Sequence, residues 1–119
     1  MPGLWIFLGG GAGAVLRWLL AAQFDSPWGV VICNIIGSFL LAVLAHPGLG
    51  ASPELRLALG TGLLGGFTTY STFNLDTLQA LQQGQPTTAL LNVVVTLFVA
   101  LAAAAVGWAL AGWATSNPN

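Results

Sequence analysis

The chain has 119 residues, enough for one domain, and only 4% of them are charged: two arginines and three acidic residues. A soluble domain carries about 25% charged residues, so a surface that faces water is excluded, and two arginines make no basic patch for nucleic acid. With 56% hydrophobic residues and a mean hydropathy of +0.87, the chain is predicted to be an all-α integral membrane protein.

Four segments are long and apolar enough to cross a bilayer core, which takes about 20 helical residues. They are predicted at residues 4–24, 28–45, 55–81 and 88–113. Pro27, Pro53 and Pro86 each lie near a helix start, where a missing N–H is tolerated. The connections are too short for a soluble domain, so residues 1–119 are expected to form a single four-helix membrane domain. We expect no removable signal peptide and, with Cys33 as the only cysteine, no intrachain disulfide.

The first segment contains the stretch GGGAGA at residues 9–14. Gly9 and Gly13 form a GxxxG pair, and Gly62 and Gly66 repeat it in the third segment, which predicts close helix packing in lipid. The same glycines loosely fit a dinucleotide-binding fingerprint, but no βαβ pattern surrounds them. Arg17 is the only charge well inside a predicted span, where it could extend to the nearby membrane surface or cap carbonyl groups.

The second and fourth segments carry polar pairs four residues apart, on one helix face each: Asn34 with Ser38, and Asn92 with Thr96. Polar side chains in a span are costly and suggest function. Hydroxyls can instead bond to their own helix, and asparagine can join helices at a gain of about 1 kcal/mol. The number of polar groups in so short a chain nevertheless favours a functional cluster.

The third segment is about 27 residues long, and its middle reads GGFTTYSTF, residues 65–73. Two glycines weaken a helix, and successive threonines offer the backbone competing hydrogen bonds. We therefore predict a break near residues 66–70, in the middle of the membrane. Broken helices form ion sites in many transporters, and near a dimer axis the freed carbonyls of two copies could hold a cation.

The polar groups of these segments are amides, hydroxyls and aromatic rings, and no Asp or Glu lies in the middle of a span. Amides and hydroxyls donate hydrogen bonds, and ring edges carry partial positive charge. Donors without full charge suit a small anion that must be desolvated and then released. The lining therefore points to an anion, although hydroxyl oxygens can equally face a cation.

The charges give little preference for either orientation in the membrane. Arg56 lies on the side of both termini, and Arg17 lies nearer the other side. The distribution of Lys and Arg between the two sides decides the orientation of a membrane protein. Because this chain has one arginine toward each side, it is predicted to insert in both orientations, that is, to have dual topology. Oppositely inserted copies can pair about a two-fold axis in the membrane plane, as an antiparallel homodimer. A single orientation with a weak signal is the alternative.

Three motifs together identify a family. They are GGGAGAVLRW at 9–18, NIIGSFLLA at 34–42 and GTGLLGGFTTYSTF at 60–73. In this order, in a four-span chain of this length, they resemble the Fluc/CrcB family of fluoride channels over all four segments. Tyr70 departs from the usual phenylalanine, Asp76 from a frequent glutamate, Ala42 from a glycine and Val30 from a common threonine.

The resemblance implies an antiparallel, dual-topology homodimer, multi-pass in the inner (cytoplasmic) membrane, that exports fluoride passively through two pores and confers fluoride resistance. The implied pore residues are Asn34, Tyr70, Ser71, Thr72, Phe73 and Thr96. It also implies a structural sodium ion at the dimer interface, held by main-chain carbonyls of Gly65 and Thr68. The implied structural residues are Arg17, Gly9, Gly13, Ser38 and Asp76. Its partners are then fluoride, sodium, a second copy and the lipid bilayer.

Three alternatives belong to other classes. A small multidrug-type proton-coupled exporter needs an intramembrane carboxylate, but Glu54 and Asp25 lie in loops and Asp76 lies near the end of the third segment. A structural membrane subunit would explain the glycines but not the hydroxyl-rich break. An intramembrane enzyme would need a nucleophile with a base, or a metal cluster, and His46 stands alone.

Overall fold

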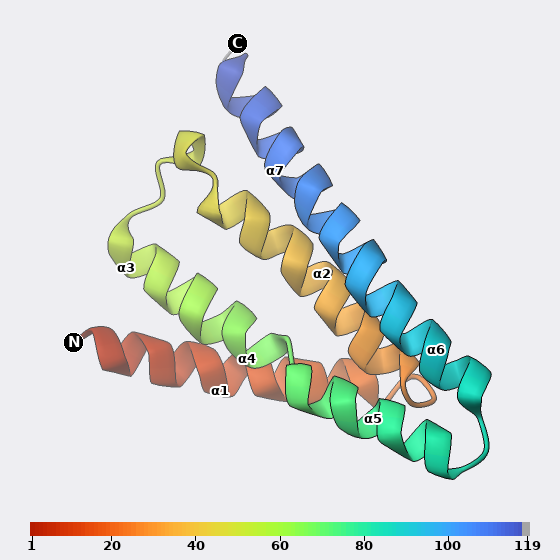
Figure 1. Cartoon of the computed structure of the whole chain (residues 1–119). Coiled ribbons are helices and arrows are strands. Elements are labelled where there is room, and N and C mark those ends of the chain that lie inside the picture. The colour runs from red at the N-terminus through yellow and green to blue at the C-terminus, as the bar shows by residue number, and fades with distance from the viewer. Residues whose placement is uncertain (118–119) are drawn as a thin grey trace.

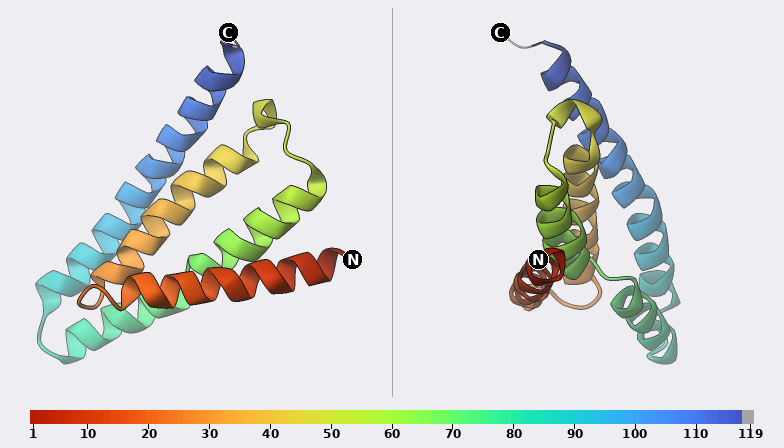
Figure 2. Two further views of the ribbon diagram at one scale, coloured as in Figure 1. Left: turned by 180° about the vertical axis from the view of Figure 1, so that it is seen from behind. Right: turned by 90° about the vertical axis from the view of Figure 1, so that its left-hand side faces the viewer.

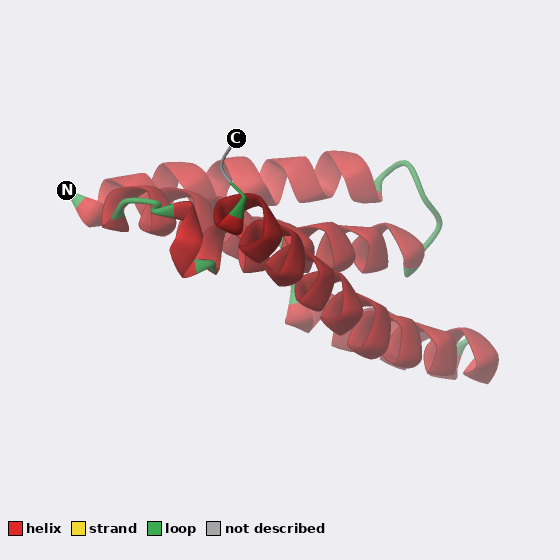
Figure 3. Cartoon of the chain, turned by 90° about the horizontal axis from the view of Figure 1, so that it is seen from above, coloured by secondary structure: helices red, strands yellow, loops and turns green. Residues whose placement is uncertain are grey.

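A computed structural model describes residues 1–117, which form helices joined by short loops and contain no strand (Figures 1 and 3). The first two segments are single helices, α1 (Pro2–Ala21) and α2 (Trp28–Ala45). A short 3-10 turn, η1 (Pro47–Leu49), follows. The third segment consists of α3 (Pro53–Leu55), the π-helical η2 (Arg56–Leu64), α4 (Gly65–Phe67) and α5 (Tyr70–Gln82). The fourth consists of α6 (Pro86–Val94), the π-helical η3 (Val95–Val99) and α7 (Ala100–Ser116).

The prediction of an all-helical membrane protein is confirmed at this level. Three continuous helices of the described chain are long and apolar enough to cross a membrane, namely Pro2–Ala21, Trp28–Ala45 and Pro86–Ser116. The third segment is not among them because its helix stops after Phe67 and starts again at Tyr70. The interruption therefore lies within the window of residues 66–70.

The helix ends follow the proline and glycine positions more closely than the hydrophobic pattern. The third and fourth segments begin two residues before the predicted starts, because Pro53 and Pro86 occupy the first helical turn. Ser52 caps the third segment by accepting a hydrogen bond from the N–H of Leu55 at 3.2 Å. Helix α5 ends before Gly84, whose φ of 71° is a left-handed conformation that glycine adopts without strain.

The segments fan out from one end of the molecule. Turns 22–27 and 83–85 lie together at the narrow end, and both termini lie at the open end with the loop around η1 (Figures 1 and 2). Helix α1 packs along η2 and α4, α2 packs along α7, and α5 packs along α6. The chain measures 52 × 33 × 19 Å along its principal axes. In so thin a molecule α2 is the best covered of the three candidate spans, whereas α1 and the span Pro86–Ser116 are mostly uncovered.

Helix α1 approaches the third segment at backbone distance. A Cβ atom added to Gly13 would lie 2.8 Å from the backbone nitrogen of Phe67, and one added to Gly9 would lie 2.9 Å from that of Leu63. On the opposite side, a Cβ added to Gly66 would collide with the Gly10 carbonyl. Of the GxxxG glycines, Gly9 and Gly62 meet directly, whereas Gly13 faces the backbone of Leu63 and Phe67 and Gly66 faces Gly10, as small residues allow between membrane helices.

This interface gives a stability prediction with a matched control on the same helix. Gly13→Ala is expected to destabilise the protein by about 1–3 kcal/mol, the cost of overpacking, because the new methyl group meets backbone that cannot rotate away. A Cβ at Gly11 would meet nothing within 4 Å, so Gly11→Ala is expected to cause no loss of stability and, through the higher helix propensity of alanine, a gain of up to about 1 kcal/mol. Thermal unfolding in detergent measures both. Equal melting temperatures for the two variants would contradict the close approach.

Candidate functional site

The interruption of the third segment is built by local hydrogen bonds of its threonines. Thr68 (φ −86°, ψ 155°) and Thr69 (φ −154°, ψ 125°) are extended. The Thr68 hydroxyl donates to the carbonyl of Leu64 at 2.9 Å, at the end of the first half. The Thr69 hydroxyl accepts from the N–H of Thr72 at 3.3 Å and so caps α5. One helix thus ends and the next begins within two residues.

Four of the backbone groups that the interruption frees are paired by side chains from the first two helices. Oδ1 of Asn34 accepts from the N–H of Thr69 at 2.9 Å, and Nδ2 donates to the Thr69 carbonyl at 3.2 Å. Nη1 of Arg17 donates to the carbonyls of Gly66 at 2.9 Å and Thr68 at 3.1 Å. An unpaired backbone group in lipid costs several kcal/mol, so these bonds are what makes the interruption tolerable.

These contacts define what Arg17 and Asn34 do in the chain. Arg17 caps carbonyls, one of the two roles open to it from the sequence, and its charge lies at the carboxyl end of a helix, where a cation is stabilised. Asn34 is 8% exposed and uses both ends of its amide on Thr69. Because its NH₂ group carries two hydrogens, one donor remains for another acceptor.

A hollow of about 450 Å³ opens beside the interruption. It contains four of the six predicted pore residues, both predicted sodium ligands and Ser38, together with four further residues. Its lining consists of Asn34, Gly37, Ser38, Leu41, Gly65, Thr68, Thr69, Tyr70, Phe73, Thr96 and Ala100. Residues from α2, both halves of the third segment and the fourth segment therefore meet at this one place.

The remaining two predicted pore residues do not line this hollow in the single chain. Ser71 is exposed, with its Oγ 3.3 Å from the Thr69 hydroxyl. Thr72 lines a separate hollow of about 120 Å³ near turn 22–27. Asp76 lines that hollow too, with its carboxylate beside the Ser26 hydroxyl. The Thr72 hydroxyl also accepts from the Thr69 hydroxyl at 3.2 Å, so Ser71 and Thr72 both remain linked to a residue that lines the 450 Å³ hollow.

The beginning of α5 presents donors at the edge of the 450 Å³ hollow. Within residues 1–117, no hydrogen bond uses the N–H of Tyr70 or of Ser71. A helix N-terminus with free N–H groups favours an anion. The rings of Tyr70 and Phe73 lie 5.7 Å apart between centroids, tilted by 32°, and the Tyr70 side chain is 75% exposed. The site thus combines free N–H groups, hydroxyls and ring edges without a carboxylate.

Behind the wall of the hollow lies Asn92, which the sequence marked as polar but did not include among the site residues. It is 1% exposed and bonds to Thr77 and Thr96. Its pairing with Thr77 could have been suspected only from the four-residue spacing of Phe73 and Thr77, which places them on one face of α5. That signal is weak without knowing which helix covers the face.

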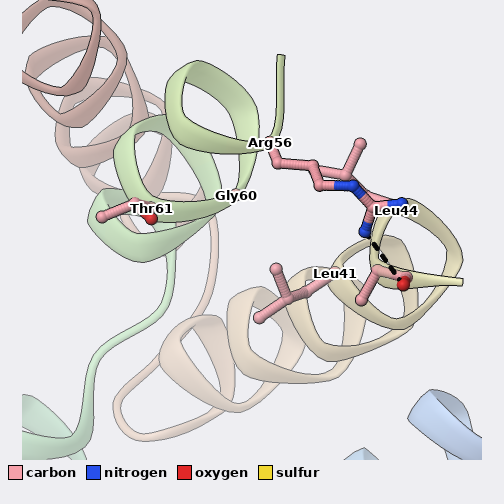
Figure 4. Close-up of a pocket in the computed structure, with 6 residues that line it drawn as sticks. Leu41, Leu44, Arg56, Gly60 and Thr61 are labelled. Atoms are coloured by element: carbon pink, nitrogen blue, oxygen red, sulfur yellow. Dashed lines mark hydrogen bonds between the residues drawn. The ribbon is translucent and has the colours of Figure 1, made fainter. Parts of the chain in front are cut away.

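Another hollow, of about 260 Å³, lies at the open end of the molecule, lined by Leu41, Leu44, Ala45, Arg56, Gly60 and Thr61 (Figure 4). Here Arg56 reaches from the third segment to the end of α2 and donates to the Ala45 carbonyl at 2.9 Å. It also donates to the carbonyl of Ala51 at 3.2 Å. Like Arg17, Arg56 is engaged by backbone carbonyls at a helix end.

The chain is similar to known proteins over most of its length. Residues 4–108 match the family model described as CrcB-like protein, Camphor Resistance (CrcB). The fluoride-specific ion channel FluC of Pectobacterium atrosepticum is 37% identical over 122 aligned residues, covering 94% of each chain. FluC of Sorangium cellulosum is 40% identical, covering 90% of this chain and 91% of the relative. FluC of Shewanella halifaxensis is 42% identical, covering 82% and 86%.

Proposed function

The chain belongs to the CrcB family, and from this membership we propose that it is a fluoride channel that lets fluoride leave the cell passively across the cytoplasmic membrane. The family is one of ion channels and not of enzymes, so catalytic chemistry is not required of the site. The observation that carries the proposal is the donor-rich, carboxylate-free hollow beside the interrupted helix.

The chemistry of the hollow suits fluoride. A small anion loses strong hydration when it enters a membrane, so the pathway must return hydrogen bonds without holding the ion too firmly. The remaining N–H of Asn34, the Thr96 hydroxyl and the ring edges of Tyr70 and Phe73 offer such contacts. The guanidinium of Arg17 already bonds to two carbonyls, so it does not trap the anion as a free cation would.

We further propose that the working unit is an antiparallel homodimer with two pores. Three features of the single chain support a partner. It is only 19 Å thick along its shortest axis. One face of α2 borders three hollows that all include Leu41, two of which also include Ser38. The two arginines lie at the interruption, on Gly66, and at the open end, on Ala45, so only one arginine stands near a membrane surface, and so weak a charge bias allows insertion in both orientations.

A structural sodium ion at the dimer interface is the third part of the proposal. Within residues 1–117 no hydrogen bond reaches the Gly65 carbonyl, and neutral carbonyls are ligands that hard cations prefer. The Thr68 carbonyl keeps one lone pair besides the one that accepts from Arg17. In this part of the chain no cluster of His, Cys, Asp or Glu offers a metal site. Carbonyls of two copies around a two-fold axis would complete the ligand set.

The test is fluoride efflux from liposomes loaded with potassium fluoride and read with a fluoride electrode. Fluoride that leaves alone builds up a membrane potential that stops further efflux. We therefore expect sustained efflux only after an ionophore lets potassium leave as well, and no comparable efflux of chloride. A proton gradient should be unnecessary, because a proton-coupled exporter needs an intramembrane carboxylate at its centre and the hollow contains none. Flux that depends on a proton gradient, or chloride flux at the same rate, would contradict the proposal.

A further inference from the structure

Asn92 is the most completely buried polar residue in the described chain, at 1% exposure. Its amide is paired in three directions. Nδ2 donates to the Thr77 hydroxyl at 2.9 Å and to the Phe73 carbonyl at 3.4 Å, and Oδ1 accepts from the Thr96 hydroxyl at 3.3 Å. Among residues 1–117, no buried side-chain nitrogen or oxygen is left without a partner. Asn92 is therefore the centre of a closed network.

The network links two residues that line the 450 Å³ hollow to two residues that lie behind its lining. Phe73 and Thr96 line the 450 Å³ hollow, whereas Asn92 and Thr77 do not. Phe73 comes from α5 and Thr96 from η3. Asn92 on α6 bonds to the backbone carbonyl of Phe73 and to the side-chain hydroxyl of Thr96. It thus fixes their relative places without facing the hollow.

The neighbouring structure gives these bonds little support from elsewhere. Helix α5 begins afresh after the interruption, and its main packing partner is α6. Residue 96 lies in a π-helical stretch, where one extra residue per turn shifts the side chains that follow. The angle of Phe73 and the direction of the Thr96 hydroxyl therefore depend on how α5 and the start of η3 are held together.

We propose that Asn92 is a positioning residue for fluoride conduction, which sets Phe73 and Thr96 in register across the α5–α6 contact. This inference rests on the proposed channel function and adds to it a residue that touches no ion. The alternative is a purely structural role, in which Asn92 only joins two helices. The two readings differ in what a substitution changes: conduction and selectivity in the first, stability alone in the second.

Asn92→Leu separates them because it leaves no polar group stranded. The Thr77 hydroxyl keeps its own bond to the Phe73 carbonyl, at 2.8 Å, and the Thr96 hydroxyl can turn to a carbonyl of its own helix. We expect fluoride efflux to fall by about tenfold, a change typical of contacting residues that act together, and chloride exclusion to weaken. The melting temperature in detergent should stay close to that of the unsubstituted protein.

Thr77 supplies a second, independent pair of variants. Thr77→Ser keeps the hydroxyl and should conduct like the unsubstituted channel, whereas Thr77→Val removes it and should slow efflux. Combining Thr77→Val with Asn92→Leu should cost no more than Asn92→Leu alone, because both break one network. Thr115→Val is the control: its hydroxyl bonds only within α7, to Ala111 at 2.8 Å and Gly112 at 3.2 Å, and efflux should not change.

The outcomes are distinguishable. Unchanged efflux and selectivity in Asn92→Leu, or equal losses in Thr77→Ser and Thr77→Val, would overturn the positioning role while the channel function stands. A lower melting temperature with an unchanged efflux rate would likewise assign Asn92 to helix joining alone. If the unsubstituted protein passes no fluoride, the proposed function fails, and this inference fails with it.

Discussion

Asn34→Asp is expected to reduce fluoride efflux by roughly a hundredfold or more, since two unit charges 4 Å apart repel by about 4 kcal/mol at an effective dielectric constant of 20. The variant keeps the oxygen that accepts from the Thr69 N–H at 2.9 Å. It loses the donor to the Thr69 carbonyl and adds negative charge to the wall of the hollow. The liposome assay with a fluoride electrode measures the change.

The matched control is Asn117→Asp, which makes the same chemical change on an exposed side chain. Asn117 follows α7 and donates to the Trp113 carbonyl at 3.1 Å, far along the chain from the interruption. Its efflux should equal that of the unsubstituted protein. If Asn34→Asp also conducts at the full rate, Asn34 does not lie on the ion pathway and serves only the backbone of Thr69.

The second large effect is expected at Arg17. Arg17→Met keeps a long apolar side chain but leaves the Gly66 and Thr68 carbonyls without their donor. An unsatisfied buried acceptor costs about 1–3 kcal/mol; both carbonyls are part-buried, so together they should lower the free energy of unfolding by about 1–3 kcal/mol. Thermal unfolding in detergent measures the loss, and efflux should fall with it because Thr68 lines the hollow.

Arg56→Met provides the comparison for Arg17→Met. It removes the same group from the same kind of partner, the carbonyls of Ala45 at 2.9 Å, Ala51 at 3.2 Å and His46 at 3.4 Å. The Ala45 contact is exposed and all three lie in the loop region at the open end, so water can take the place of the lost donor. The loss of stability should therefore be smaller. Two variants of equal stability would contradict the role assigned to Arg17 at the interruption.

The position of the interruption could be predicted because its causes are local. Gly65 and Gly66 weaken the helix, and hydroxyls at 68 and 69 compete for the backbone, which are properties of adjacent residues. The bonds from Thr68 to Leu64 and between Thr69 and Thr72 each span only three or four residues. Chemistry at that range is readable from a single sequence.

The partners of the interruption could not be predicted in the same way. Asn34 meets Thr69 across 35 residues, and Arg17 meets Gly66 across 49. A polar residue in a span indicates function but does not say what it faces. The family resemblance implies that Asn34 lies in the fluoride pore. The structure adds that its amide oxygen and nitrogen bond to the N–H and the carbonyl of Thr69.

The hydroxyl stretch shows the same limit within one helix. The family resemblance implies Ser71 and Thr72 as pore residues together with Tyr70 and Phe73. In a helix of 3.6 residues per turn, residues three apart share a face and the residues between them do not. Tyr70 and Phe73 accordingly line one hollow and Thr72 another. The dimer, the sodium ion and the roles of Ser71 and Thr72 remain predictions.

The residues that bond to the interrupted backbone are also synthesised in a definite order. A ribosome delivers the chain from its N-terminus, so Arg17 and Asn34 are synthesised before the Gly66–Thr69 backbone that they bond. The donors are therefore already in the bilayer when the weakest segment arrives, and its exposed peptide groups need not wait for another molecule. Asn92 follows Phe73 in the chain, so the bond from its Nδ2 to the Phe73 carbonyl can form only once the fourth segment has been synthesised.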